Sequence, residues 1–167
     1  MSNASGRIEG GRVVVSREID APPEEAWRAW IDPDQIRQWW GPTGFTCPRA
    51  DVDFRIGGTT LVTMQAPEEY GGFQMSNRWT YTAIDEPSRI EFISTFADSE
   101  GKVIEPADAG IPAGVPAEVP HVVDFEALPG DRTLVTVSEY GYTSEDARSQ
   151  SEAGQQQVMD KMRALFT

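Results

Sequence analysis

The stretch DAPPEEAWRAWIDPDQIRQWWGP, Asp20–Pro42, contains two signals for the start of a helix and one for its end. Pro23 and the two glutamates after it suit a first helical turn, because proline fixes a helical φ angle and acidic side chains complement the N-terminal dipole. Asp32 before Pro33 again places an N-cap residue ahead of a first-turn proline. Gly41-Pro42 ends this second helix after about two turns. The stretch therefore predicts two short helices with a break between them.

Trp39 and Trp40 stand side by side at the end of the second predicted helix. Neighbouring helical residues point about 100° apart, so the two rings cannot be buried in the same direction. Ile36 lies at helical spacing from both rings and places at least one of them against a sheet. Either both rings belong to the core, or one belongs to the core and the other lines a cavity. In the second case we expect Trp39 in the core and Trp40 toward the cavity.

Outside these helices, apolar and polar residues alternate with a period of two, which is typical of half-buried strands. Between Asp51 and Ile56, for example, apolar Val52, Phe54 and Ile56 alternate with charged residues. Turns rich in glycine and proline separate the alternating segments. The pattern predicts seven strands, at Arg12–Ile19, Asp51–Ile56, Thr59–Ala66, Phe73–Ile84, Arg89–Phe96, His121–Leu128 and Arg132–Tyr140.

The predicted strand Phe73–Ile84 has one apolar face with a single amide on it. This face carries Phe73, Met75, Asn77, Trp79 and Tyr81. It forms either plain core or an adaptable apolar pocket, and Asn77 needs a hydrogen-bond partner there. The opposite face is polar and is expected in solvent, with Gln74, Ser76, Arg78, Thr80 and Thr82.

Two further segments complete the layout. Ala97–Pro120 contains four prolines and no periodicity, which predicts a long loop of the kind that is often functional. After a capping signal at Thr143–Asp146, apolar residues recur at helical spacing up to the C-terminus. A helix of about 23 residues is roughly 35 Å long and would cross a whole sheet. The order predicts an α+β fold, in which an antiparallel sheet is segregated from the helices. A sheet that curves strongly around the final helix would leave a cavity between them, and we take this cavity as a hypothesis.

The composition excludes several classes of protein. The chain of 167 residues carries a net charge of −13, which disfavours binding to nucleic acid or to an anionic membrane surface. No apolar run reaches the length of a membrane span, and no signal peptide is evident. The single cysteine, Cys47, forms no internal disulfide and fits a cytoplasmic location. One histidine and one cysteine do not make a zinc site, and a reactive Cys47 thiol is not expected. We expect residues 1–11 to be a disordered lead-in with a tag scar, and residues 12–167 to form one domain.

Several segments together resemble a known family. The motifs are SREIDAPPEEAWRAWIDPDQIRQWWGP, then DFRIGG and EPSRIEF, and finally HVVDFEAL with TLVTVSEYGYTSED. They resemble bacterial proteins related to the activator of the ninety-kilodalton heat-shock chaperone's ATPase. The resemblance implies a START-like (SRPBCC) helix-grip fold, shared with polyketide cyclases and the birch-pollen allergen. That superfamily often encloses a hydrophobic ligand and has no common catalytic set, so the fold alone assigns no reaction.

The first functional hypothesis is a binding module for a small apolar or amphipathic molecule, held between the sheet and the C-terminal helix, with the Ala97–Pro120 loop as a lid. No cofactor or metal is expected, and a homodimer is compatible with the sequence. The predicted ligand-binding residues are Trp40, Met64, Met75, Asn77, Trp79, Tyr81, Phe96, His121 and Glu139.

Two alternatives stay open at this point. His121, the only histidine, is predicted to face Glu139 across adjacent strands. With Glu139 or Tyr81 it would transfer protons in a cyclase-like or dehydratase-like enzyme, although the simpler interpretation is a strand-end histidine. The second alternative is a chaperone-cofactor-like or other protein-interaction module, whose acidic surface binds a basic partner.

Overall fold

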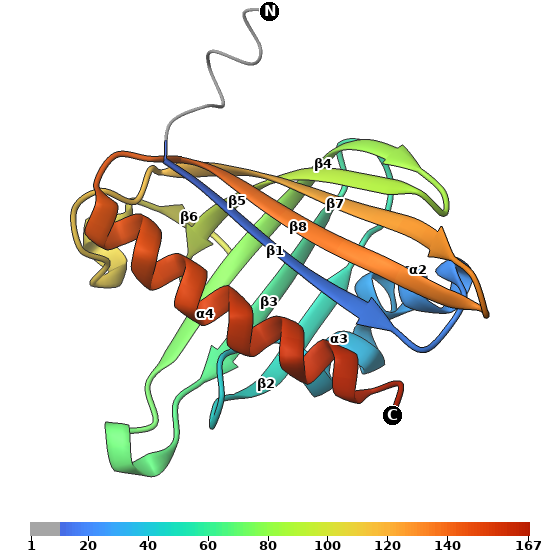
Figure 1. The fold of residues 1–167 in the computed structure, drawn as a ribbon. Helices are drawn as coiled ribbons and strands as arrows, with labels where there is room; N and C mark the ends of the chain where they lie inside the picture. The colour runs from blue at the N-terminus through green and yellow to red at the C-terminus, as the bar shows by residue number, and fades with distance from the viewer. Residues whose placement is uncertain (1–10) are drawn as a thin grey trace, which may run out of the picture.

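The computed structural model describes residues 11–167, so the predicted lead-in lies outside the described residues except for Gly11, which is in the first strand. The elements follow one another in the predicted order (Figure 1). Helices α2 and α3 lie between the first two strands, and α4 closes the chain. The strands are β1 (Gly11–Ile19), β2 (Thr46–Val52), β3 (Thr59–Gln65), β4 (Gln74–Asp85), β5 (Arg89–Ala97), β6 (Val103–Ile104), β7 (Glu118–Leu128) and β8 (Arg132–Tyr142); the helices are α2 (Pro23–Ile31), α3 (Pro33–Trp39) and α4 (Glu145–Ala164).

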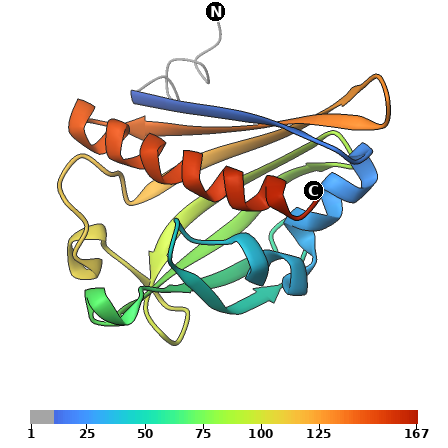
Figure 2. The same ribbon diagram turned by 60° about the horizontal axis from the view of Figure 1, so that its bottom comes forward.

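The strands form one antiparallel sheet in the order β1-β8-β7-β5-β4-β3-β2, with β6 paired to β5. The sheet curves around α4, which runs along its concave side (Figures 1 and 2). Helices α2 and α3 cover the remaining part of that side near the end of α4. This arrangement confirms the predicted α+β helix-grip fold.

The break between α2 and α3 follows from local chemistry. The side chain of Asp32 accepts a hydrogen bond from the Asp34 backbone N–H at 2.8 Å, as an N-cap residue does. Asp32 itself is extended, with a φ of −87° and a ψ of 118°, so one helix cannot continue into the next. The capping and proline signals in the sequence therefore place both helices correctly.

Two predicted segments differ in the structure. Strand β2 is Thr46–Val52 instead of 51–56, and the chain after Val52 turns, leaving Ile56 58% exposed. Apolar and charged residues continue to alternate after Val52, although the chain there forms a turn and not a strand. The predicted loop 97–120 is also shorter and more ordered than expected. It contains β6 and a 3-10 helix, Pro106–Ala109, and its last residues, with Pro120, already belong to β7.

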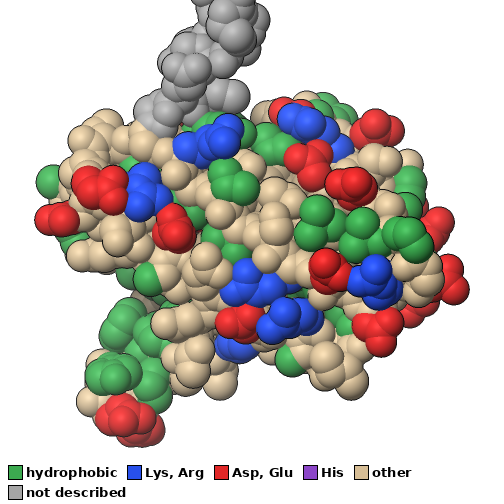
Figure 3. Space-filling model, viewed as in Figure 1, with side chains coloured by type: hydrophobic (Ala, Val, Ile, Leu, Met, Phe, Trp, Pro, Cys, Tyr) green, Lys and Arg blue, Asp and Glu red, His purple; other side chains and the backbone are tan. Residues whose placement is uncertain are grey.

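The two faces of β4 are less regular than the alternation predicts. Phe73 lies just before the strand, is 47% exposed and packs edge-on against Phe45. Hydrophobic side chains gather on the projecting lobe at the lower left of Figure 3, where the β3–β4 hairpin lies. On the opposite face, Ser76 is buried instead of solvated, and its hydroxyl bonds that of Thr63 at 2.8 Å. Residues of the segment between β5 and β6 cover this part of the face, as a pocket shared by Ser76 and Asp98 indicates.

A cluster of aromatic rings fills the core under α2 and α3. Trp39 is fully buried, its indole N–H donates to the Ala29 carbonyl at 2.9 Å, and its ring lies 4.6 Å from that of Trp30. Trp79 stacks on Phe92 at 4.7 Å. Since Trp39 joins the two short helices, and the ring of Trp30 lies 6.2 Å from that of Trp79 on β4, the cluster fixes how the helices sit on the concave side.

The C-terminal half of α4 is tied to the turn after α3. Lys161 donates to the carbonyls of Gly41, Pro42 and Phe45 at 3.1, 3.5 and 3.0 Å. An ammonium has three donors, so this one side chain can satisfy all three carbonyls. Within residues 11–167, no helix is long and apolar enough to cross a membrane.

Removing the Trp39 ring should lower stability strongly. Trp39→Ala leaves a cavity and an unpaired Ala29 carbonyl, and we expect a loss of about 3 to 5 kcal/mol in the free energy of unfolding. Ile56→Ala, at an exposed apolar position, is the control and should change it by less than about 0.5 kcal/mol. Denaturant titration measures both, and equal losses would contradict the assignment of Trp39 to the core.

Candidate functional site

A cavity of about 360 Å³ lies between the concave side of the sheet and α4. Strands β3, β4, β5, β7 and β8 form its floor, α4 its roof, and the segment before β7 one wall. Its lining is mainly apolar, with a few polar groups at one end. The lining residues are Trp40, Gly41, Pro42, Met64, Met75, Asn77, Ser94, Phe96, Ile111, Pro112, Val115, Val119, His121, Glu139, Tyr142, Ala147, Gln150, Ser151, Gly154, Gln155 and Val158.

The structure brings most of the sequence-predicted site residues to this cavity. It places Trp40, Met64, Met75, Asn77, Phe96, His121 and Glu139 in the lining. Of the two adjacent tryptophans, Trp39 is in the core and Trp40 is at the cavity. The amide of Asn77 donates to the Thr95 carbonyl over a long 3.5 Å, so it has only a weak partner.

Trp79 and Tyr81 were predicted to bind ligand, but neither lines the cavity. Trp79 is 1% exposed, because the rings of Trp40 and Phe92 cover it. The Tyr81 hydroxyl lies 2.5 Å from that of Thr60, away from His121, and burial raises the pKa of Tyr81 to about 12. Both residues share the concave face with Met75 and Asn77 but lie further along β4, where the core is filled. Tyr81 is therefore not available to a proton-transfer site at His121.

The polar end of the cavity is built around the buried carboxylate of Glu139, which is 6% exposed. Tyr142 lies three residues further along β8, and its hydroxyl donates to Oε1 of Glu139 at 2.5 Å. From α4, the amide Nε2 of Gln155 donates to Oε2 of Glu139. Burial, followed by the charge of Glu139, raises the pKa of Tyr142, so this hydroxyl stays a donor at ordinary pH. Strand and helix thus meet at one carboxylate.

His121 lies directly opposite Glu139 in the register of β7 and β8. Its Nδ1 is 3.0 Å from the Val119 carbonyl, and its ring stacks on Phe92 with centroids 4.7 Å apart. The other nitrogen, Nε2, is 3.9 Å from Oε2 of Glu139, which is beyond hydrogen-bond distance. The ring is therefore held in place by its backbone contact and by stacking, and not by the carboxylate.

Two buried polar atoms at the cavity have no hydrogen-bond partner among the described residues. They are the indole nitrogen of Trp40 and the amide oxygen Oε1 of Gln155. Buried polar groups in folded proteins are nearly always paired, because an unpaired one costs about 1 to 3 kcal/mol. The cavity lining therefore includes residues with one unpaired donor and one unpaired acceptor, while two further unpaired indoles, Trp27 and Trp30, lie in the core.

The sequence missed the contribution of α4 to the site, although the signal was present. Gly154 and Val158 belong to the positions that recur at helical spacing, and both line the cavity. Gln155 extends the stripe that these positions form and is buried. A polar residue beside an apolar stripe is a sequence signal for a polar side chain that faces the site. A Cβ atom on Gly154 would meet no atom of the rest of the protein within 4 Å. This glycine therefore does not serve close packing against the sheet, but leaves the cavity open beneath the helix.

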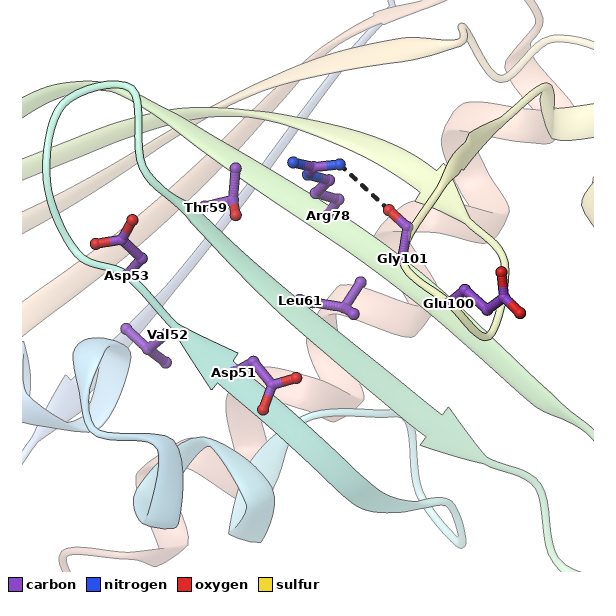
Figure 4. Close-up of a pocket in the computed structure, with 8 residues that line it drawn as sticks. All are labelled: Asp51, Val52, Asp53, Thr59, Leu61, Arg78, Glu100 and Gly101. Atoms are coloured by element: carbon purple, nitrogen blue, oxygen red, sulfur yellow. Dashed lines mark hydrogen bonds between the residues drawn. The ribbon is translucent and has the colours of Figure 1, made fainter.

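A second pocket, of about 310 Å³, lies between β2, β3, β4 and the turn before β6 (Figure 4). It contains several charged residues, most of which already have partners. Arg78 donates to the Gly101 carbonyl at 3.2 Å, while Asp51 and Asp53 pair with arginines two residues away. The pocket between sheet and α4 is therefore the better candidate for a functional site.

Cys47 is buried, and its thiol donates to the Arg49 carbonyl at 3.2 Å. Burial raises the pKa of this thiol, which makes it a poor nucleophile. Within the described residues, no three His, Cys, Asp or Glu side chains are grouped so that they could hold a metal ion.

One known protein family matches most of the chain. A family model described as "Activator of Hsp90 ATPase homolog 1-like protein" matches residues 20–167. The chain belongs to this family. The resemblance seen in the sequence motifs is thereby confirmed, and the fold fits the START-like (SRPBCC) superfamily. No curated protein matches the chain.

Solved structures of bacterial members of this fold are similar over nearly their whole length. Protein Ms6760 from Mycobacterium smegmatis is 26% identical with a TM-score of 0.73, covering 94% of this chain and 91% of that one. A protein from Arthrobacter aurescens is 25% identical with a TM-score of 0.74, covering 94% and 86%. The AHSA1 protein from Silicibacter pomeroyi, 20% identical with a TM-score of 0.72 and coverage of 92% and 96%, shows the same fold.

The bond between Tyr142 and Glu139 should contribute measurably to stability. Tyr142→Phe removes a donor from a buried carboxylate, and we expect a loss of about 1 to 3 kcal/mol in the free energy of unfolding. Tyr140→Phe, two residues earlier and outside this network, is the matched control and should change it by less than about 0.5 kcal/mol. If the two variants unfold at the same denaturant concentration, the network does not hold β8 as described.

Proposed function

We propose that this member of the AHSA1-like family binds a small apolar or amphipathic molecule in the cavity between the sheet and α4. The observation that carries the proposal is the cavity itself, which has an apolar lining and unpaired polar atoms at Trp40 and Gln155. Ligand sites are commonly concave, mostly apolar and provided with a few polar groups that orient the ligand. The volume of about 360 Å³ is within the usual range for such sites.

The chemistry of the lining favours binding by burial of apolar surface. Met64, Met75 and Phe96 form an apolar floor, and methionine side chains adapt to irregular ligand shapes. Burial contributes about 25 cal/mol for each Å² of apolar surface, before the cost of ordering the ligand is subtracted. The floor thus supplies affinity, while the polar end around Glu139 supplies orientation.

The segment before β7 is suited to control access to the cavity. Ile111, Pro112 and Val115 contribute to the wall. Gly114 has a φ of +103°, and its carbonyl accepts from the Thr143 N–H at 2.9 Å, so the segment is attached where β8 meets α4. A Cβ atom on Gly114 would come within 2.3 Å of the Ser144 hydroxyl, which explains why glycine fits here. We include this segment in the proposal as the lid.

We place binding ahead of the proton-transfer alternative. That alternative uses Glu139 to orient His121 for proton transfer, whereas the two groups are 3.9 Å apart, beyond hydrogen-bond distance. Tyr81, the other partner considered, lies outside the cavity. Orientation of a bound molecule requires no such pairing, and the stacked His121 ring is well suited to it.

Filling the cavity from Gly154 tests the proposal without damaging the fold. Gly154→Leu should weaken binding of decanol at least about tenfold, which corresponds to about 1.4 kcal/mol, because the side chain would occupy the ligand space. Gly154→Ala is the matched control and should retain most of the binding. Both variants should be more stable, by about 1 kcal/mol for alanine in a helix interior, or about 2 to 4 °C in melting temperature.

Decanol binding is followed by titration of ¹⁵N-labelled protein, with chemical shifts of the lining residues as the readout. Decanol that leaves the wild-type lining unshifted, or that binds equally well to the Gly154→Leu variant, would contradict the proposal. Calorimetric melting of each variant separates blocked binding from lost folding.

A further inference from the structure

Several polar groups at the Glu139 end of the cavity have free acceptor positions. A carboxylate has about four acceptor positions, and Tyr142 and Gln155 occupy two of those on Glu139. The remaining positions belong to a buried group that lines the cavity. Both neighbours donate to the carboxylate.

His121 adds a second acceptor beside the carboxylate. Its Nδ1 faces the Val119 carbonyl, and since a carbonyl only accepts, Nδ1 carries the proton. In the neutral ring, Nε2 then has a lone pair and no proton. This lone pair lies 3.9 Å from Oε2 of Glu139, so two acceptors face one another without a donor between them.

Gln155 supplies a third acceptor, and its orientation is fixed by Glu139. Because a carboxylate accepts only, the NH2 group of Gln155 must point to it, as Nε2 does. The amide oxygen Oε1 therefore points elsewhere, is buried and has no partner among the described residues. Gln155 is 9% exposed, so solvent does not readily satisfy this oxygen.

The charge of the site has the same sign as these acceptors. Among the described residues that line the cavity, Glu139 is the single Asp, Glu, Lys or Arg side chain. The whole chain carries a net charge of −13, which raises the local concentration of cations. The indole N–H of Trp40 is a buried donor without a partner among the described residues, and the face of its ring can contact a cation.

We propose that the ligand of this cavity is an apolar molecule with a protonated amine, whose N–H groups donate to Glu139, His121 and Gln155 while its apolar part lies against Met64, Met75 and Phe96. The inference rests on the proposed binding function and assigns the chemical class of the ligand. An ammonium supplies three donors and one positive charge, which matches three acceptors and one negative charge.

A carboxylate ligand of the same length would meet the opposite situation. Its charge would be buried beside that of Glu139, and its oxygens would face acceptors. Like charges at close distance in a poorly solvated site repel strongly, and unpaired buried acceptors add to the cost. The site is therefore expected to discriminate against fatty acids.

Three ligands that share one alkyl chain test this inference, namely decylamine, decanol and decanoate. Each is titrated below its micelle concentration at neutral pH and moderate salt, with calorimetry as the measurement. We expect wild-type protein to bind decylamine at least about tenfold more tightly than decanol, and decanoate more weakly than either. Glu139→Gln keeps the size of the side chain but removes its charge, and it should reduce the preference for decylamine over decanol to nearly one.

A second variant keeps the test independent of the buried network. Gln150 is exposed and lines the cavity, so Gln150→Lys places a positive charge at its edge and should also reduce the preference for decylamine. Ser149→Lys adds the same charge at the adjacent exposed position outside the lining and should leave the preference unchanged.

The outcomes separate this inference from the proposed function. Decanoate binding as tightly as decylamine, or a preference for decylamine that survives both Glu139→Gln and Gln150→Lys, overturns the inference and leaves apolar binding intact. Absence of binding by all three ligands overturns both. Selective decylamine binding that is lost in the two variants and kept in Ser149→Lys supports both.

Discussion

A buried carboxylate needs hydrogen-bond donors, and this need joins the two halves of the site. Glu139 is 6% exposed and receives one donor from Tyr142 on its own strand and another from Gln155 on α4. Leaving such a charge unpaired would be strongly destabilising. The bond to Gln155 therefore joins α4 to β8 at the polar end of the cavity.

The cavity follows from the different shapes of the elements. A curved sheet with seven neighbouring strands is wider than one helix, so α4 alone does not fill its concave side. Near α2 and α3 the remaining space is filled by Trp30, Trp39 and Trp79. At the other end the side chains that face the space do not fill it, and Gly154 has no side chain at all. The fold thus has a solid end and a hollow end, and Trp40 lies at the boundary.

The sequence predicts interactions between neighbouring residues better than contacts between residues that are far apart in the chain. Caps and prolines act locally, so the break at Asp32 was predictable. Alternation assigns a side chain to a face of the sheet but does not tell how far along a curved strand the core is filled. For that reason Tyr81 was assigned to the site with Met75, although only Met75 reaches it. Gln155 escaped notice because its partner lies 16 residues away in the sequence, and helical periodicity alone describes a glutamine as a surface residue.

A crystal structure of the protein grown with decylamine would show whether the space between the sheet and α4 is a ligand site with Glu139 at its polar end. We expect electron density for the alkyl chain along Met64, Met75 and Phe96, with the nitrogen about 3 Å from the Glu139 carboxylate. A structure in which Trp40 and the methionines close the space, or in which decylamine lies only on the surface, would contradict it.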